Sequence, residues 1–201
     1  MSVLFDRLSC AFKRGHMREV DGLITDERFA LAGRNTQAAV LIAVTDGPQP
    51  GVILTQRPTT MRDHPGQVAF PGGKLEPGED AASAALREAH EELALHPDNV
   101  RLIGSTDIYQ TGTGFTITPV VGVVPPDLPY IPNPREVEDW FETPLDILLD
   151  DRNWTHNEVM WRGQNRAFLE MQWHNFRIWG VTAAIIFNLS RRIAAKDVLD
   201  G

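Results

Sequence analysis

Residues 72–93 read GGKLEPGEDAASAALREAHEEL, a loop of glycine and proline that runs into an alanine-rich segment. Pro77-Gly78 interrupts regular structure, and Asp80 after it is a residue type that caps helices. Alanine and leucine, which favour helices, fill the interior, and His96-Pro97 closes the pattern. The stretch therefore predicts a helix over residues 80–93 that is entered from a sharply turning loop.

Three glutamates lie on one side of this predicted helix. At about 100° per residue, Glu88, Glu91 and Glu92 share an arc of about 100°. A solvated charged face is one explanation. However, like charges three and four residues apart destabilise a helix by a few tenths of a kcal/mol per pair, and no lysine follows one turn later to offset them. A bound divalent cation would offset the repulsion, and all-oxygen ligands favour magnesium or manganese over zinc.

The loop before the helix has two explanations. Proline and glycine can simply mark a turn. Alternatively, Gly72 and Gly73 let the backbone approach a phosphate or a metal closely, and amide groups at a helix start attract anions. The spacing matches neither the P-loop nor the dinucleotide-binding pattern, so both of those nucleotide sites are excluded.

The spacing of charged residues resembles a known signature. After Gly73 come five residues, Glu79, seven residues, Arg87-Glu88, an apolar residue, His90 and Glu91-Glu92. This resembles the Nudix box of hydrolases that cleave nucleoside diphosphates linked to another group. The box normally continues with one residue, a glycine and an aliphatic residue, whereas this chain has Leu93, Ala94 and Leu95. The departure concerns the end of the helix, where glycine usually supplies a left-handed cap.

A second resemblance lies upstream of the helix and indicates one branch of the same superfamily. Leu54-Thr55-Gln56-Arg57 is followed by residues 62–73, RDHPGQVAFPGG. This segment is similar to the additional signature of the coenzyme A pyrophosphatase branch of the Nudix superfamily. Further matches are Glu136-Val137, Pro144-Leu145, Leu148 to Asp150, Ile178 to Gly180 and Thr182-Ala183, so the likeness runs from about residue 37 to residue 190.

The resemblance implies a role for each charged residue of the box. Glu88, Glu91 and Glu92 would hold Mg²⁺ or Mn²⁺, whereas Arg87 would face away from the metal and pair with Glu79. A carboxylate must accept the proton of the attacking water. Glu92 is one candidate for this general base, and Glu136 or Glu138 from a distant segment is another. The predicted catalytic residues are therefore Glu88, Glu91, Glu92, Arg87 and Glu136.

The local charge suggests where a phosphorylated substrate binds. Residues 51–74 carry three basic residues and one acidic residue, whereas residues 75–93 carry one basic and six acidic residues. A basic loop beside an acidic helix suits a polyanion that is bridged by metal. We expect the substrate to contact the following residues: Arg57, Arg62, His64, Gly72, Gly73 and Lys74. Arg62 and His64 have an alternative role, which is to brace the loop.

The function expected from the resemblance is metal-dependent hydrolysis of the pyrophosphate bond of coenzyme A or acyl-CoA. The products would be 4′-phosphopantetheine, or its acyl form, and adenosine 3′,5′-bisphosphate. A Nudix hydrolase of ADP-ribose, NADH or a nucleoside triphosphate is a second hypothesis. A non-catalytic ligand-binding module is a third, but such proteins usually lack a metal-binding carboxylate, and all three glutamates are present here.

Composition excludes several other classes of protein. The 201 residues carry 19 basic and 27 acidic side chains, a net charge of −8 that argues against a nucleic-acid binder. Cys10 is the single cysteine, so neither an internal disulfide nor a cysteine-based zinc site is expected. No apolar run approaches the roughly 20 residues of a membrane span. We expect a cytoplasmic enzyme with a small-molecule substrate and no nucleic-acid or membrane partner. The sequence leaves open whether the enzyme forms a homodimer.

The pattern of the whole chain indicates an α+β fold, a mixed β-sheet sandwiched between helices in the α/β/α layers of the Nudix fold. Strands are predicted at residues 36–45, 51–57, 101–109, 115–124 and 135–141, with a hairpin at 158–173 around Gly163-Gln164. Besides the helix at 80–93, short and closing helices are predicted at 144–150 and 181–195. Residues 1–35 would form a helical appendage packed on a single Nudix domain at 36–201.

Overall fold

The main sheet is mixed and lies at the centre of the molecule. The computed structural model of the chain describes residues 2–26, 28, 30, 33–161 and 164–199. The path of the sheet is β3 (Val68–Ala69), β2 (Gly51–Gln56), β1 (Thr36–Thr45), β7 (Phe115–Val124) and β5 (Arg101–Ser105). Off this path, β4 (Gly72–Lys74) pairs with β1, β6 (Tyr109–Gln110) with β7, and β8 (Asp139–Pro144) with β2. β1 and β7 are parallel, whereas the other pairs are antiparallel.

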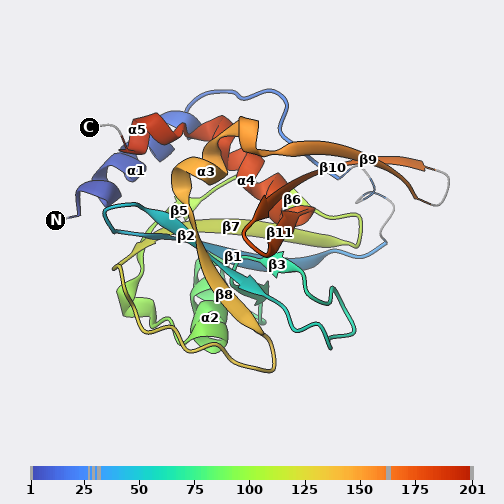
Figure 1. Ribbon diagram of the computed structural model, residues 1–201, viewed down its shortest axis with the longest axis horizontal. Coiled ribbons are helices and arrows are strands. Elements are labelled where there is room, and N and C mark those ends of the chain that lie inside the picture. The colour runs from blue at the N-terminus through green and yellow to red at the C-terminus, as the bar shows by residue number, and fades with distance from the viewer. Residues whose placement is uncertain (1, 27, 29, 31–32, 162–163, 200–201) are drawn as a thin grey trace.

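A second, three-stranded antiparallel sheet packs on the first. Its order is β11 (Phe176–Trp179), β10 (Gln164–Trp173) and β9 (Thr155–Trp161). The ring of Phe176 stacks on Phe141 of β8 at a centroid separation of 3.8 Å, which joins the two sheets. In Figure 1 this small sheet lies above the main sheet and extends toward one end of the molecule.

Helices cover both faces of the main sheet. α2 (Ala81–Leu93) lies below it, whereas α1 (Val3–His16), α3 (Leu145–Leu149), α4 (Val181–Arg192) and α5 (Ala195–Leu199) lie above it (Figure 1). The strands supply two cores because successive side chains point to opposite faces. Leu41 of β1 is buried with α2, and Ile42 is buried on the side of α1 and α4. The predicted α+β layering is therefore confirmed.

Most predicted strands and helices are observed, and the differences have local causes. The strand predicted at 135–141 begins at Asp139, because residues 133–137 form a turn in which the Val137 amide donates to the Asn133 carbonyl, 2.8 Å. The strand predicted at 101–109 is split into β5 and β6. The helix predicted at 181–195 is α4, which ends at Arg192. The helix predicted at 144–150 is α3, and Pro144 precedes it as its cap.

Three short strands were not predicted at all. β3 and β4 lie between the strand predicted at 51–57 and the helix predicted at 80–93, and β11 follows the hairpin. They are too short for a pattern of alternating side chains to show in the sequence. The hairpin itself begins earlier than predicted, at Thr155. Of the predicted turn Gly163-Gln164, residue 163 lies outside the described residues and Gln164 begins β10.

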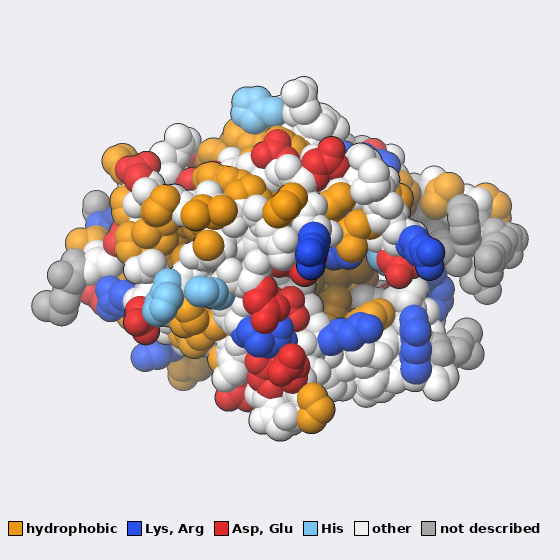
Figure 2. Space-filling view, turned by 90° about the horizontal axis from the view of Figure 1, so that it is seen from below, with side chains coloured by type: hydrophobic (Ala, Val, Ile, Leu, Met, Phe, Trp, Pro, Cys, Tyr) orange, Lys and Arg blue, Asp and Glu red, His pale blue; other side chains and the backbone are white. Residues whose placement is uncertain are grey.

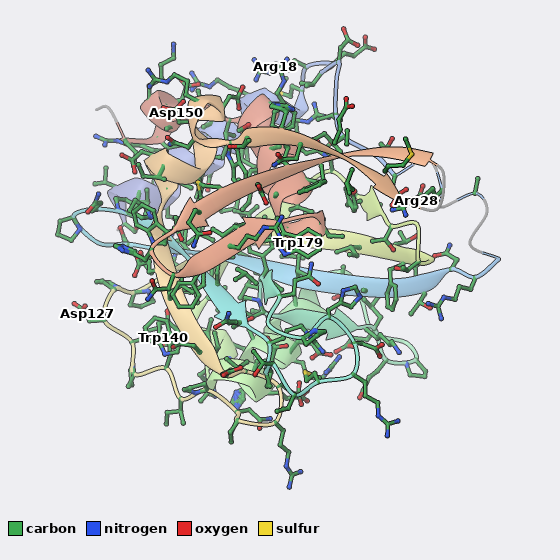
Figure 3. The ribbon with its side chains drawn as sticks, turned by 45° about the vertical axis from the view of Figure 1, so that its right-hand side comes forward. Arg18, Arg28, Asp127, Trp140, Asp150 and Trp179 are labelled. Atoms are coloured by element: carbon green, nitrogen blue, oxygen red, sulfur yellow. The ribbon has the colours of Figure 1, made fainter. Side chains whose placement is uncertain are left out.

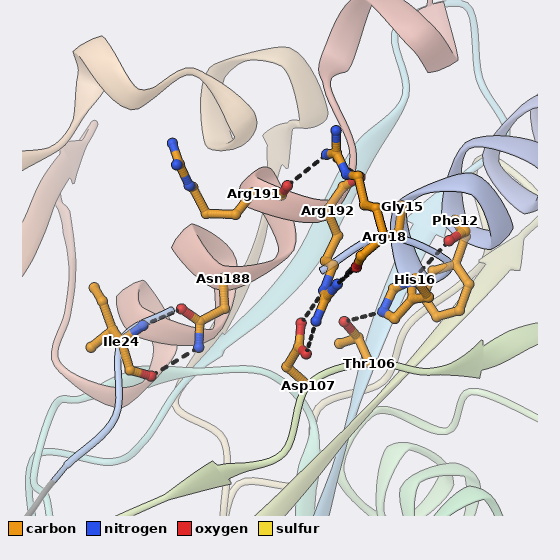
Figure 4. A network of polar contacts seen from close by, with 10 residues as sticks. All are labelled: Phe12, Gly15, His16, Arg18, Ile24, Thr106, Asp107, Asn188, Arg191 and Arg192. Atoms are coloured by element: carbon orange, nitrogen blue, oxygen red, sulfur yellow. Dashed lines mark hydrogen bonds and ion pairs between the residues drawn. The ribbon is translucent and has the colours of Figure 1, made fainter. Parts of the chain in front are cut away.

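The N-terminal helix contributes to the core of the main body. Leu4, Leu8 and Phe12 of α1 are buried in the same cluster as residues of α4. Figure 4 shows polar contacts near the end of α1. There Arg192 of α4 donates to both carboxylate oxygens of Asp107 at 2.7 and 2.8 Å. The division into an appendage at 1–35 and a domain at 36–201 stays a prediction. No helix in the described parts of the chain is long and apolar enough to cross a membrane.

Candidate active site

Helix α2 begins and ends as the sequence indicates, with one unusual residue. The Asp80 carboxylate accepts a hydrogen bond from the Ser83 amide at 2.7 Å and caps the first turn. At the other end Ala94 adopts the left-handed conformation, φ 54° and ψ 25°, and its amide donates to the His90 carbonyl at 2.9 Å. The helix therefore ends with the left-handed conformation that glycine usually supplies. For Ala94 this conformation costs about 1–2 kcal/mol.

Three carboxylates converge beside α2. Glu88, Glu92 and Glu136 each offer an oxygen within 4.8 Å of the others. Glu136 comes from the segment before β8, and this segment is docked on the end of α2. The Asn133 amide donates to the Glu92 carbonyl at 2.8 Å, and the Glu136 amide donates in turn to the Asn133 carbonyl at 3.0 Å. Because the segment is tied to the backbone of α2, Glu136 is brought to the two helix glutamates.

Glu92 is the most deeply placed of these carboxylates, with 5% of its surface exposed. Burial and, less strongly, the negative charges of Glu88 and Glu136 raise its pKa to about 8, although the Gly72 amide and Arg57 favour the charged form. Burial also raises the pKa of Glu88. Oε2 of Glu92 has no hydrogen-bond partner within the described part of the chain. A buried, unpaired carboxylate oxygen is costly unless a cation or proton satisfies it.

These residues fit a hard divalent cation. The cluster offers carboxylate oxygens alone, which is the ligand set of Mg²⁺ or Mn²⁺. The unpaired oxygen of Glu92 points to the same conclusion, because one cation would satisfy it and reduce the repulsion between the three carboxylates.

Arg87 joins the loop to the helix, as predicted. Its guanidinium donates to both oxygens of Glu79 at 3.0 and 3.1 Å, and also to the Lys74 carbonyl at 3.0 Å. Arg87 lowers the pKa of Glu79 by this hydrogen bond. Arg87 also donates to Glu88 at 3.0 Å and to Glu91 at 3.1 Å, so it contacts two of the three predicted metal-binding residues as well as Glu79.

Glu91 is placed differently from the other two glutamates of the box. Half of its side chain, 51%, is exposed, and its carboxylate accepts from Arg87. It is not in the group of carboxylates within 4.8 Å of one another, which Glu136 completes instead. The structure thus brings together Glu88, Glu92 and Glu136, and it places Glu91 at the solvent edge of the same helix.

Gly72 and Gly73 lie in close contact with neighbouring groups. A Cβ atom at Gly72 would lie 2.4 Å from the Ala39 carbonyl oxygen of β1. One at Gly73 would lie 2.2 Å from Oε1 of Glu88. Gly72 is therefore required by close packing against the backbone of the neighbouring strand, whereas a side chain at Gly73 would displace the Glu88 carboxylate.

The predicted substrate-binding residues of the upstream loop differ in exposure. Arg57 is half-buried, and its Nε has no hydrogen-bond partner among the described residues. Arg62, His64 and Lys74 are exposed. His64 has a positive φ of 54°, and its carbonyl accepts from the Gln67 amide at 3.2 Å, so its backbone forms part of the loop's turn.

Glu138, one of the three candidates for the general base, lies outside the cluster. Its Oε2 accepts a hydrogen bond from the Thr59 amide at 2.8 Å. It therefore helps to hold the upstream loop beside the segment that carries Glu136. Glu92 and Glu136 remain the candidates whose carboxylates lie together.

Figure 2 shows how these charges meet on the surface. Acidic side chains gather in one patch with a basic side chain among them, and a hollow beside the patch has Lys and Arg side chains on its rim. This arrangement of a carboxylate patch next to a basic rim agrees with the charge pattern expected from the sequence. Such a surface can hold an anionic ligand through a cation at one end and through side chains at the other.

Comparisons with known proteins show the family to which the chain belongs. A family model described as NUDIX domain matches residues 35–162. The protein named "Uncharacterized Nudix hydrolase NudL" of Enterobacter sp. (strain 638) is 46% identical over 163 residues, which cover 80% of this chain and 84% of that protein. The protein of the same name from Escherichia coli (strain K12) is 43% identical over 161 residues, with the same coverage of 80% and 84%.

A solved structure is also similar, the binary complex of a C. elegans Ap4A hydrolase. It aligns with a TM-score of 0.48 and 20% identity over 55% of this chain and 81% of that chain. From the family match and the relatives in sequence, this chain belongs to the Nudix family. It is a Nudix hydrolase, an enzyme that acts on small nucleoside diphosphate derivatives, and such enzymes generally use divalent cations such as Mg²⁺ or Mn²⁺.

Proposed function

We propose that this Nudix hydrolase cleaves the pyrophosphate bond of coenzyme A or acyl-CoA. The observation that supports it most is the position of the upstream loop. Arg57, which ends the first part of the segment similar to the coenzyme A pyrophosphatase signature, lies near enough to Glu92 to favour its charged form, and Gly73, which ends the second part, packs against Glu88. The segment resembling that signature thus adjoins the carboxylate cluster, where a diphosphate bound at the cluster would meet it.

In this proposal the glutamates of the box and the loop before them hold the reacting diphosphate. Glu88, Glu91 and Glu92 are the proposed metal-binding residues, and Glu136 joins them because its carboxylate lies within 4.8 Å of Glu88 and Glu92. When bound, Mg²⁺ or Mn²⁺ supplies positive charge to the phosphoryl oxygens and lowers the pKa of water. Arg87 keeps the loop on the helix through Glu79 and the Lys74 carbonyl.

The reaction needs a base and positive groups around the diphosphate. A water oxygen forms the new bond to phosphorus, its proton passes to Glu92 or Glu136, and the bond to the bridging oxygen breaks. Arg57, Arg62, His64 and Lys74 are the proposed contacts for the phosphate oxygens, and the glycines 72 and 73 let the backbone approach them. Products are 4′-phosphopantetheine, or its acyl form, and adenosine 3′,5′-bisphosphate.

Hydrolysis of another nucleoside diphosphate derivative, such as ADP-ribose or NADH, is the alternative. It uses the same carboxylates and differs in the groups on either side of the diphosphate. A panel of coenzyme A, acetyl-CoA, ADP-ribose, NADH and nucleoside triphosphates with Mg²⁺ or Mn²⁺, scored for products, tests the proposal. We expect adenosine 3′,5′-bisphosphate to be released from coenzyme A or its thioester with the highest kcat/KM of the panel.

Variants separate chemistry from binding in this assay. Glu92→Gln should abolish turnover, whereas Glu19→Gln, an exposed glutamate of the N-terminal segment, should retain it. Arg62→Ala should raise KM for coenzyme A, and an unchanged KM would exclude the proposed phosphate contact for that residue. A higher kcat/KM for ADP-ribose or NADH than for coenzyme A would replace the proposed substrate with the alternative.

A further inference from the structure

Two aromatic rings meet at the ends of the segment that carries Glu136. Residues 131–139 lie between Tyr130, in the proline-rich loop after β7, and Trp140 of β8. Both aromatic side chains are half-buried and pack against the core between the main sheet and α2. Their rings meet edge to face, with the centroids 4.7 Å apart and the planes at 62° to each other. This ring contact therefore joins the entry of the segment to its exit.

Trp140 is the fixed side of the contact. It lies opposite Thr55 in the register of β8 with β2, so strand pairing in the main sheet holds its backbone. Figure 3 shows Trp140 on β8, on the same side of the molecule as Asp127 of the loop that leads to Tyr130. Edge-to-face packing is a preferred arrangement of two aromatic rings. The entry of the segment thus docks on a ring that the main sheet already positions.

Tyr130 is held by its ring and not by its hydroxyl group. The hydroxyl oxygen is buried and has no hydrogen-bond partner in the described part of the chain. Burial and the negative charge of Glu142 raise the pKa of Tyr130 to about 12, so the hydroxyl group stays neutral. A buried hydroxyl group without a partner is unfavourable, so the packing of the ring is what keeps Tyr130 in this position.

Between the two rings the backbone is tied to the end of α2. The Ile131 amide, directly after Tyr130, donates to the carbonyl of the last residue of α2 at 2.9 Å. The Asn133 amide donates to the Glu92 carbonyl at 2.8 Å, and the turn that begins at Asn133 leads to Glu136. A displacement of Tyr130 would therefore strain the bonds that place Glu136 beside the helix glutamates.

We propose that Tyr130 and Trp140 are positioning residues for the Glu136 carboxylate. They act through the segment between them and touch neither the substrate nor the cation. Without the ring contact, Glu136 lies beside Glu88 and Glu92 for less of the time, and a cation is bound more weakly. This inference rests on the proposed function, in which Glu136 joins the helix glutamates in metal binding. It gives a role in the site to two residues outside the Nudix box and the upstream signature.

The first test measures metal binding in the absence of substrate. Mn²⁺ is titrated at pH 8 and the rise in Tm is recorded for the wild type and each variant. Trp140→Leu and Tyr130→Leu should each need about tenfold more Mn²⁺ for half of the wild-type rise, as expected for Glu136→Gln. Tyr130→Phe keeps the ring and removes only the unpaired hydroxyl group, so it should restore the wild-type titration.

A double variant separates positioning from a loss of stability. If the rings act through Glu136, the variant that combines Trp140→Leu with Glu136→Gln should bind Mn²⁺ as weakly as Glu136→Gln alone. A purely structural effect would instead add to the effect of Glu136→Gln.

Trp173→Leu is the matched control. Trp173 is also half-buried, and its ring lies edge to face with His174 at the same centroid separation of 4.7 Å. However, it packs against the core on the other side of the main sheet. Trp173→Leu should lower the Tm of the metal-free protein and keep the wild-type Mn²⁺ affinity.

Hydrolysis of coenzyme A separates this inference from the proposed function. Trp140→Leu should lower kcat more than it raises KM, because Glu136 lies at the carboxylate cluster. Wild-type Mn²⁺ affinity in both Trp140→Leu and Tyr130→Leu, an additive loss in the double variant, or wild-type affinity in Glu136→Gln would overturn the positioning role. A wild-type enzyme that cleaves neither coenzyme A nor its thioesters, with Mn²⁺ binding that still depends on Trp140, would overturn the proposed substrate and support the positioning role.

Discussion

A Cβ atom added to Gly73 would lie 2.2 Å from Oε1 of Glu88, so the loop before α2 and the first glutamate of the carboxylate cluster are in direct contact. Gly73, the first residue of the Nudix box, therefore matters for the position of Glu88 as well as for the turn of the loop. It leaves the space that the Glu88 carboxylate occupies beside Glu92 and Glu136.

Gly73→Ala should displace the Glu88 carboxylate and lower kcat/KM by about 100-fold, because a shift of about 1 Å in a reacting group has that effect. Circular dichroism and thermal unfolding would show whether the fold is kept. Gly47→Ala is the matched control, since its Cβ would lie at an ordinary 3.7 Å from Pro126. Activity of Gly73→Ala equal to that of Gly47→Ala would contradict this role of Gly73.

Glu92→Gln should stabilise the metal-free enzyme while it abolishes activity. The folded-state pKa of Glu92 is raised to about 8 by burial, so the folded protein holds a proton that the unfolded chain releases at lower pH. The contribution of protonated Glu92 to the free energy of unfolding is complete below the ordinary glutamate pKa. It is lost as the pH rises to about 8, where the buried carboxyl loses its proton. In EDTA, the Tm of Glu92→Gln should exceed that of the wild type increasingly from pH 5 to pH 8, by roughly 2–4 °C per kcal/mol. A constant difference in Tm across this range would refute the buried charge as its cause.

Metal binding should depend on Glu136 as well as on the helix glutamates. Mn²⁺ should raise the Tm of the wild type at pH 8, because it binds the folded state alone. Glu88→Gln and Glu136→Gln should each need about tenfold more Mn²⁺ for half of the wild-type shift. Glu138→Gln, which alters the neighbouring carboxylate bound to the Thr59 amide, should titrate like the wild type.

The variant Glu91→Gln tests, in the same Mn²⁺ titration, whether Glu91 contributes to metal binding. Its carboxylate is paired with Arg87 in the structure, so metal binding requires it to leave that contact. Weaker Mn²⁺ binding in Glu91→Gln would support its proposed role. Wild-type Mn²⁺ binding in both Glu91→Gln and Glu136→Gln would leave Glu88 and Glu92 as the metal-binding residues.

Ala94→Gly should stabilise the protein by about 1 kcal/mol, because Ala94 has a positive φ of 54° and glycine adopts this conformation without steric cost. Equilibrium unfolding in urea measures the change. Ala82→Gly, inside the same helix, should have the opposite effect and destabilise by a similar amount. A loss of stability in Ala94→Gly would show that the left-handed cap carries no strain.

Helix α2 could be predicted closely from the sequence, because its cap, its interior and its end are all local. The Asp80 cap and the pairing of Arg87 with Glu79 followed from residues fewer than ten positions apart, and both are confirmed. The strands 36–45 and 115–124 were also predicted with their observed bounds. Long apolar runs identify such strands by themselves.

Other features depended on contacts that no local pattern shows. The sequence offered both Glu136 and Glu138 as general-base candidates and listed Glu136 among the catalytic residues. The turn at Asn133, docked on the end of α2, brings Glu136 and not Glu138 to the cluster. The strand predicted at 135–141 was displaced by the same turn. β11 was missed, because four residues are too few to show a period and pairing with β10 defines them as a strand.

The sequence by itself therefore determined the family, the acidic helix and the spacing of its glutamates, since these are properties of neighbouring residues. Tertiary structure decided which carboxylates meet, because that depends on how a segment more than forty residues away docks on α2. It also decided which distant residues share a face of the sheet, because the register of β4, β1 and β7 places Lys74 opposite Ala38 and Ala38 opposite Ile117.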